Sequence, residues 1–112
     1  MTGYHLICDG FLKQKINQEK IKEILERVAE MAEMEIINGP HIVEGKKDNP
    51  GWTGICIIDF SHIAFHTFEN EMVFSFDLYS CKEFSETVIV DYLNKVEEIK
   101  NFNQQFFRRQ VI

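Results

Sequence analysis

Three apolar segments, separated by only a few residues each, occupy the middle of the chain and constrain its fold more than any other feature. They span residues 53–60, 63–68 and 72–80, and a hairpin turn is predicted between the last two at Asn70-Glu71. Short runs rich in β-branched and aromatic residues are typical of strands. Because the connections between them are short, neighbouring strands are expected to run antiparallel.

A helix is predicted on each side of these strands. Each has a residue suited to the N-cap, Asn17 for the first and Ser85 for the second. Apolar residues recur at helical spacing after each cap: Ile21, Ile24, Leu25, Val28 and Ala32 in the first helix, and Ile89, Tyr92, Leu93 and Val96 in the second.

The order of elements predicts one domain over residues 1–112. Further strands are expected at 4–8, at 34–43 with a break at 38–40, and at 102–111 as an edge strand. The predicted fold class is α+β, a two-layer α/β sandwich whose antiparallel sheet carries two helices on one face. The strands are apolar on both sides, so the second sheet face is expected to be covered by dimerisation or by a ligand.

Composition and charge exclude several classes of function. A formal net charge of −6, with basic residues scattered along the chain, argues against binding to nucleic-acid phosphates. No apolar run reaches the roughly 18 residues that a membrane span requires. Without a signal-peptide pattern at its start, the chain is predicted to be cytoplasmic.

The cysteines and histidines do not form a metal-binding pattern. The three cysteines are odd in number and contain no CxxC pair, which argues against a disulfide framework and a structural zinc site. Cys8 and Cys56 lie in strand-like segments and are predicted to be small buried residues. His62 and His66 share one face of a predicted strand but stand about 13 Å apart, too far to share a metal. No metal is predicted.

Three blocks between residues 51 and 81 are informative about chemistry. They read Gly51-Trp52-Thr53-Gly54, then Phe60-Ser61-His62-Ile63-Ala64-Phe65-His66-Thr67-Phe68, then Asp77-Leu78-Tyr79-Ser80-Cys81. The chain thereby resembles the bacterial and archaeal S-adenosylmethionine decarboxylases, which carry G-x-S-G, then E-S-H-[hydrophobic]-x-[hydrophobic]-H-T-W-P-E, then D-[hydrophobic]-[aromatic]-T-C-G. The spacing between blocks matches without a gap. Two further segments are similar, Gly3-x-His5-Leu6 and Gly39-Pro40-His41-Ile42.

The resemblance implies a self-processing decarboxylase that depends on a pyruvoyl group. Ser61 would attack the carbonyl of Phe60, the chain would break between them, and Ser61 would become the pyruvoyl cofactor, which forms a Schiff base with the substrate amine. The resemblance assigns Thr53 and His66 to processing and Cys81 to protonation of the product. It also implies spermidine biosynthesis and a homodimer with sites near its interface.

Substrate contacts are implied at neighbouring positions. Phe68 retains an aromatic ring that would stack on adenine. Asn70 stands where the family has a carboxylate for the ribose hydroxyls, and Glu69 or Glu71 is a candidate substitute. An aromatic residue of the preceding loop is replaced by Lys47. The processing residues are therefore retained better than those that bind the nucleoside.

Three functions follow from this pattern. The first is decarboxylation of S-adenosylmethionine. The second is the same chemistry on a plain amino acid, arginine or ornithine, which the replacement at Asn70 favours. The third is a non-catalytic, unprocessed relative that acts as a partner subunit. Phe60 replaces the family glutamate before the serine and changes the local charge, although the acyl donor is a backbone carbonyl.

The spacing of the processing residues constrains their geometry. Ser61 and His66 are five residues apart, so on one straight strand their side chains would face opposite sides of the sheet. The strand is therefore predicted to begin after Ser61, with the Phe60–Ser61 bond in a bend. Cys81 shares its parity with Asp77 and Ser75, which predicts that these three face the same side.

Overall fold

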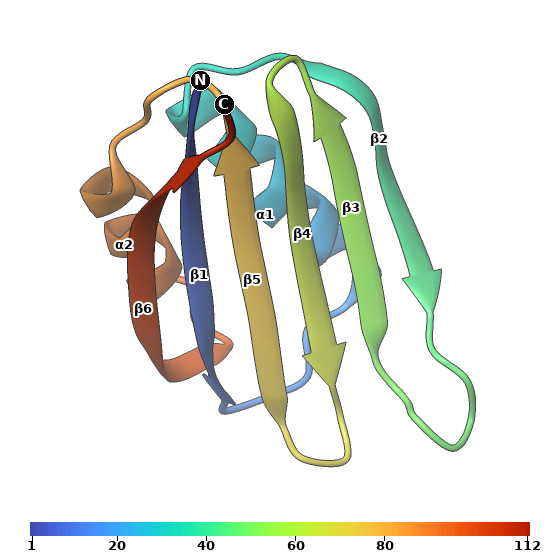
Figure 1. The fold of residues 1–112 in the computed structure, drawn as a ribbon. Coiled ribbons are helices and arrows are strands. Elements are labelled where there is room, and N and C mark those ends of the chain that lie inside the picture. Colours follow the sequence, from blue (N-terminus) through green and yellow to red (C-terminus); the bar gives the residue numbers. More distant parts are fainter.

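A single antiparallel sheet of six strands, in the order β2-β3-β4-β5-β1-β6, organises the chain. The computed structural model describes all of residues 1–112 and places both helices behind this sheet (Figure 1). The predicted two-layer α+β sandwich is thus confirmed. The elements are β1 (Thr2–Leu12), α1 (Gln18–Met31), β2 (Ile36–Glu44), β3 (Trp52–Ile58), β4 (Ser61–Phe68), β5 (Val73–Ser80), α2 (Glu86–Asn94) and β6 (Ile99–Gln110).

Both helices begin at the predicted caps. The Asn17 side chain accepts a hydrogen bond from the backbone N–H of Lys20, and Ser85 accepts one from Val88. The apolar stripe of α1 packs against β2, β3 and β4, while α2 packs against β6. Neither helix is long and apolar enough to cross a membrane.

The core lies between the helices and one face of the sheet. Phe65 of β4 and Phe74 of β5 stack with ring centroids 5.4 Å apart at its centre, and both rings are buried. Cys8 and Cys56 are also buried, as predicted, and burial raises the pKa of their thiols to about 12 and about 11. These two cysteines are therefore unreactive core residues.

The boundary between β3 and β4 differs from the prediction. The predicted strand 53–60 ends earlier, at Ile58, because Asp59 and Phe60 form a turn; the N–H of Asp59 bonds to the carbonyl of Glu35. Strand β4 begins at Ser61, which pairs with Ile58, and not after Ser61. The bend therefore lies one residue earlier than predicted, at Asp59 and Phe60. The Phe60–Ser61 bond connects this turn to the first residue of β4.

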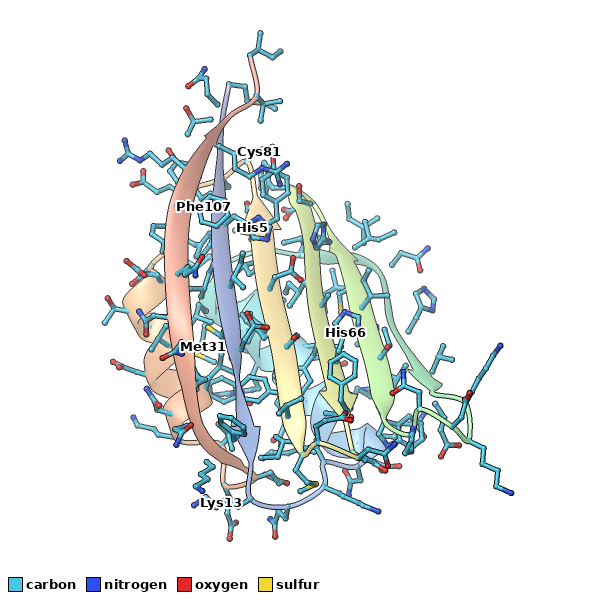
Figure 2. All side chains as sticks on the ribbon, turned by 60° about the horizontal axis from the view of Figure 1, so that its bottom comes forward. His5, Lys13, Met31, His66, Cys81 and Phe107 are labelled. Atoms are coloured by element: carbon cyan, nitrogen blue, oxygen red, sulfur yellow. The ribbon has the colours of Figure 1, made fainter.

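The second face of the sheet, here called the open face, carries no helix (Figure 2). Strand alternation places on it every second side chain of the six strands. It is more polar than the sequence predicted, since Ser75, Asp77 and His62 lie among apolar residues. The open face includes His5, Ile7, Asp9, Thr53, Ile55, Ile57, His62, His66, Phe68, Ser75, Asp77, Tyr79 and Phe107.

Candidate active site

The bond between Phe60 and Ser61 is held at the end of the β3–β4 turn by a backbone contact. The N–H of Cys81 donates a hydrogen bond to the carbonyl oxygen of Phe60, with N and O 3.2 Å apart. Ser61 pairs with Ser80 across β4 and β5, so Cys81 follows directly after this last pair. The carbonyl that Ser61 would attack is therefore already polarised by a hydrogen-bond donor, a contact that sequence reasoning did not predict.

Ser61 and Cys81 lie near this bond in different environments. Ser61 has the strand parity of Ile63 and Phe65, so its hydroxyl lies on the helix side at the end of the sheet, where it is partly buried. Cys81 is a free thiol of intermediate exposure, unlike the two buried cysteines. Figure 2 shows Cys81 at the same end of the sheet as His5. One cluster thus contains the candidate nucleophile, the carbonyl that it would attack and the thiol.

Thr53, His66 and Phe68 form a second cluster, which lies on the open face. Thr53 pairs with His66, and the Thr53 Oγ1 and His66 Nδ1 atoms lie 3.1 Å apart, within hydrogen-bond range. The ring of Phe68 stacks near that of His66, with centroids 6.3 Å apart. Gly51, just before β3, has a φ of +145° and approaches the Thr67 carbonyl so closely that no side chain would fit there.

The structure does not bring all four predicted catalytic residues together within one chain. His66 lies five strand positions beyond Ser61, which corresponds to about 16 Å at the rise of a β-strand. In Figure 2, His66 lies well along the sheet from the end that carries Cys81. Ser61 with Cys81, and Thr53 with His66, are therefore two half-sites.

A third cluster on the open face was not among the predicted site residues. Asp77 Oδ2 accepts hydrogen bonds from two histidine Nε2 atoms, of His5 at 2.9 Å and of His62 at 3.4 Å. Burial opposes ionisation of Asp77, but the hydrogen bonds and positive charge of His62 and His5 outweigh it and lower the pKa of this carboxyl. The signal in the sequence was the hairpin turn at Asn70-Glu71. It pairs His62 with Tyr79, and Asp77 lies two residues from Tyr79 and therefore on the same face of the sheet.

Replacing Asp77 with asparagine is expected to destabilise the fold by roughly 1 to 3 kcal/mol at pH 7, because a charged acceptor of two hydrogen bonds is lost. Since folding lowers the pKa of Asp77, its contribution is complete above the ordinary carboxyl pKa and is lost as pH falls through the lowered value. Urea unfolding of the Ser61→Ala chain, which should stay uncleaved, measures this at pH 7 and in acid. Asp91→Asn, at an exposed position of α2, is the matched control. An equal effect of both substitutions would contradict the assignment.

Two of the three predicted substrate-binding residues, Glu69 and Asn70, lie in the turn after β4. The Glu69 carboxylate lies 3.8 Å from the Lys15 ammonium, and Lys15 belongs to the connection between β1 and α1. Asn70 is exposed in the turn between β4 and β5. Only Phe68 lies on the open face beside His66. Glu71, the other candidate substitute, is exposed in the same turn.

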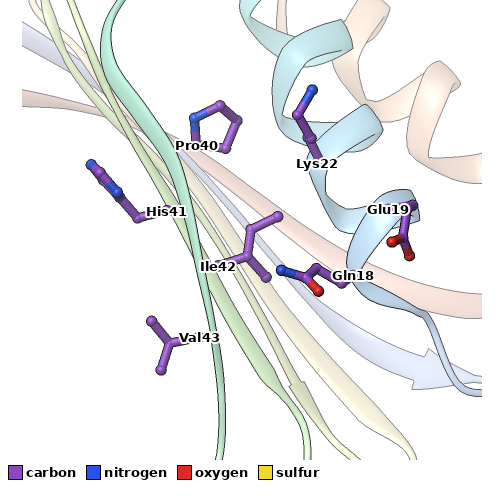
Figure 3. A pocket seen from close by; sticks show the side chains of 7 residues that line it. All are labelled: Gln18, Glu19, Lys22, Pro40, His41, Ile42 and Val43. Carbon is purple, nitrogen blue, oxygen red and sulfur yellow. The ribbon is translucent and has the colours of Figure 1, made fainter.

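The largest groove lies elsewhere, between α1 and the edge strand β2 (Figure 3). It has a volume of about 510 Å³ and contains none of the predicted site residues. No group of three or more His, Cys, Asp or Glu side chains is arranged to hold a metal ion. The lining residues of the groove are Gln18, Glu19, Lys22, Pro40, His41, Ile42 and Val43.

The chain is similar to known decarboxylases along most of its length. The profile of the S-adenosylmethionine decarboxylase family matches residues 4–110. A relative described as S-adenosylmethionine decarboxylase proenzyme, from Clostridium botulinum strain Loch Maree, is 33% identical over 99 residues, which are 84% of this chain and 82% of the relative. A protein of the same description from Archaeoglobus fulgidus is 28% identical over 90 residues, 77% of each chain.

A solved structure shares the fold. The crystal structure of the adenosylmethionine decarboxylase from Aquifex aeolicus VF5 superposes with a TM-score of 0.79 at 24% identity, and the match covers 98% of this chain and 92% of that one. The low identity to all these proteins agrees with a divergent sequence. The match over residues 4–110, together with the relatives, establishes that this chain belongs to the S-adenosylmethionine decarboxylase family.

Proposed function

We propose that the chain is a proenzyme that cleaves itself between Phe60 and Ser61 and becomes a pyruvoyl-dependent S-adenosylmethionine decarboxylase of spermidine biosynthesis. The hydrogen bond from the Cys81 N–H to the Phe60 carbonyl is the observation that carries this proposal. It supplies a donor to the one oxygen that becomes negatively charged when Ser61 attacks. A cytoplasmic location fits three cysteines that are all free.

The residues around the Phe60–Ser61 bond fit a pyruvoyl group at position 61. Residue 61 would become the first residue of β4, at the end of the sheet and next to a thiol, Cys81, of intermediate exposure. Once formed, the pyruvoyl group supplies an electrophilic carbonyl that withdraws electrons from the substrate carbon losing CO2. We assign to the Cys81 thiol the return of a proton to the product.

Processing uses atoms of the chain itself. The Ser61 Oγ bonds to the Phe60 carbonyl carbon, and the oxyanion is stabilised by the Cys81 N–H. The Phe60–Ser61 peptide bond then breaks, with a proton passing to the Ser61 nitrogen, and an ester remains. Removal of the Ser61 Cα proton expels the Phe60 carboxylate and leaves dehydroalanine. Water hydrolyses this group to pyruvoyl and releases ammonia.

A homodimer is proposed because a single chain separates the two half-sites. Proton transfer requires a base within hydrogen-bond reach, whereas His66 lies about 16 Å from Ser61 at the rise of a strand. If two open faces pack together with their strands reversed by a two-fold axis, His66 and Thr53 of one copy come to the end of the sheet that carries the Phe60–Ser61 bond and Cys81 in the other. The absence of helices from the open face leaves room for this arrangement.

The same chemistry on arginine or ornithine is the second candidate function. It is favoured by Asn70, which replaces the family carboxylate and is exposed in the turn, and by the contact of Glu69 with Lys15. A third candidate, an uncleaved partner subunit without activity, is favoured by the replacement of the glutamate before the serine with Phe60.

Release of CO2 from three labelled substrates separates these candidates. We expect the cleaved protein to prefer S-adenosylmethionine over arginine and ornithine by at least about 100-fold in kcat/KM. The Ser61→Ala chain is the control for contaminating decarboxylases. A preference for arginine or ornithine would contradict the first candidate function and support the second. An intact mass of 13.2 kDa that persists for days, without CO2 release, would support the third.

A further inference from the structure

We propose that Ser80 is a positioning residue for self-cleavage, because its hydroxyl holds the turn that directs the Cys81 N–H at the Phe60 carbonyl. This inference rests on the proposed function. Ser80 is one of the few polar residues that are completely buried in the fold. It is also the last residue of β5, so sheet pairing no longer restrains the chain after it.

The Ser80 hydroxyl closes a short turn around Cys81. Its Oγ accepts a hydrogen bond from the backbone N–H of Lys82, with a distance of 2.9 Å. A serine side chain that bonds the backbone two residues later replaces a contact that regular structure no longer provides. The peptide units on both sides of Cys81 are thereby held, and one of them carries the N–H that reaches Phe60.

The Lys82 side chain anchors the same turn from its other side. Its ammonium donates a hydrogen bond of 2.8 Å to the carbonyl of Glu33, just beyond the end of α1. The same ammonium lies 5.8 Å from the centre of the Phe60 ring, close enough for a cation–π contact. The turn is thus connected to the sheet through Ser80, to the helix layer through Glu33 and to the scissile residue through Phe60.

The turn matters for the reaction because it orients the Cys81 N–H toward the Phe60 carbonyl oxygen. When Ser61 attacks, the carbonyl electron pair moves onto the Phe60 oxygen, and stabilisation depends on a donor already at hydrogen-bond distance. At 3.2 Å, the Cys81 N–H is near the long end of that range, so a small rotation of the turn would remove it. Ser80 also lies directly opposite Ser61 in the sheet, which places the restraint beside the nucleophile.

Four variants test this role through the rate of chain cleavage, read as intact mass against time. Ser80→Ala and Ser80→Val are expected to cleave at least about tenfold more slowly than the unchanged chain. Ser80→Thr, which has the shape of valine but keeps a hydroxyl, is expected to stay within about threefold of it. Ser85→Ala removes the N-cap of α2 and costs about 1 kcal/mol of stability but leaves the hydrogen bond between Ser80 and Lys82 intact, so it should leave the rate unchanged.

The outcomes separate this inference from the proposed function. If the unchanged chain never cleaves, the proposed function fails. If it cleaves and Ser80→Ala keeps its rate, the positioning role is overturned. Equal rates for Ser80→Thr and Ser80→Val would also overturn it, because these two differ only in the hydroxyl. That comparison decides the question even if Ser80→Ala does not fold.

Discussion

Replacing Ser61 with alanine is expected to abolish cleavage and leave one chain of 13.2 kDa. The unchanged chain should instead yield two fragments that meet at the Phe60–Ser61 bond. Alanine has no hydroxyl to attack the Phe60 carbonyl, so a loss of more than about a thousandfold in rate is expected. Denatured intact mass after prolonged incubation measures it.

The fold of this variant should survive, which makes the result interpretable. Ser61 is the first residue of β4 and only partly buried, and its side chain makes no hydrogen bond that the substitution would break. We expect a change in unfolding free energy within about 1 kcal/mol. Ser85→Ala, which also loses a hydroxyl, should cleave normally. Cleavage of the Ser61→Ala chain at the same bond would attribute the cut to a protease.

Mixing two inactive chains is expected to restore cleavage. Ser61→Ala keeps His66 but has no nucleophile, and His66→Ala keeps Ser61 but has no histidine. Each alone should remain whole. In dimers that contain one copy of each, the half-site with Ser61 meets the half-site with His66, so about half of the His66→Ala chains should be cut after random pairing.

A tag on one of the two variant chains, Ser61→Ala or His66→Ala, allows mass spectrometry to distinguish them. The control replaces the first partner with the double variant Ser61→Ala/His66→Ala, which supplies no histidine at all and should restore nothing. If the His66→Ala chain remains whole in mixtures that are demonstrably dimeric, the two half-sites do not form a shared site. If it is cut without any partner, His66 has no part in processing.

Much of the fold was predictable from the sequence because it depends on local patterns. The apolar spacing between Ile21 and Val28 places α1, and Asn17 and Ser85 are side chains that can satisfy free N–H groups at a helix start. The break predicted around residues 38–40 is present as irregular pairing of β2 with β3. The start of β4 at Ser61 was missed, because a two-residue turn and a short bend have nearly the same composition.

By itself, the sequence determined the family and the residue types of the candidate site, since spaced motifs survive when most other positions change. Three things were decided only by the tertiary structure. It separates Ser61 from His66, because strand rise turns five residues into about 16 Å. It joins His5 and His62 through Asp77, because β1, β4 and β5 become neighbours only in the sheet. It also directs the Cys81 N–H at Phe60. Backbone hydrogen bonds between distant segments leave no pattern in the side chains, so sequence alone does not reveal them.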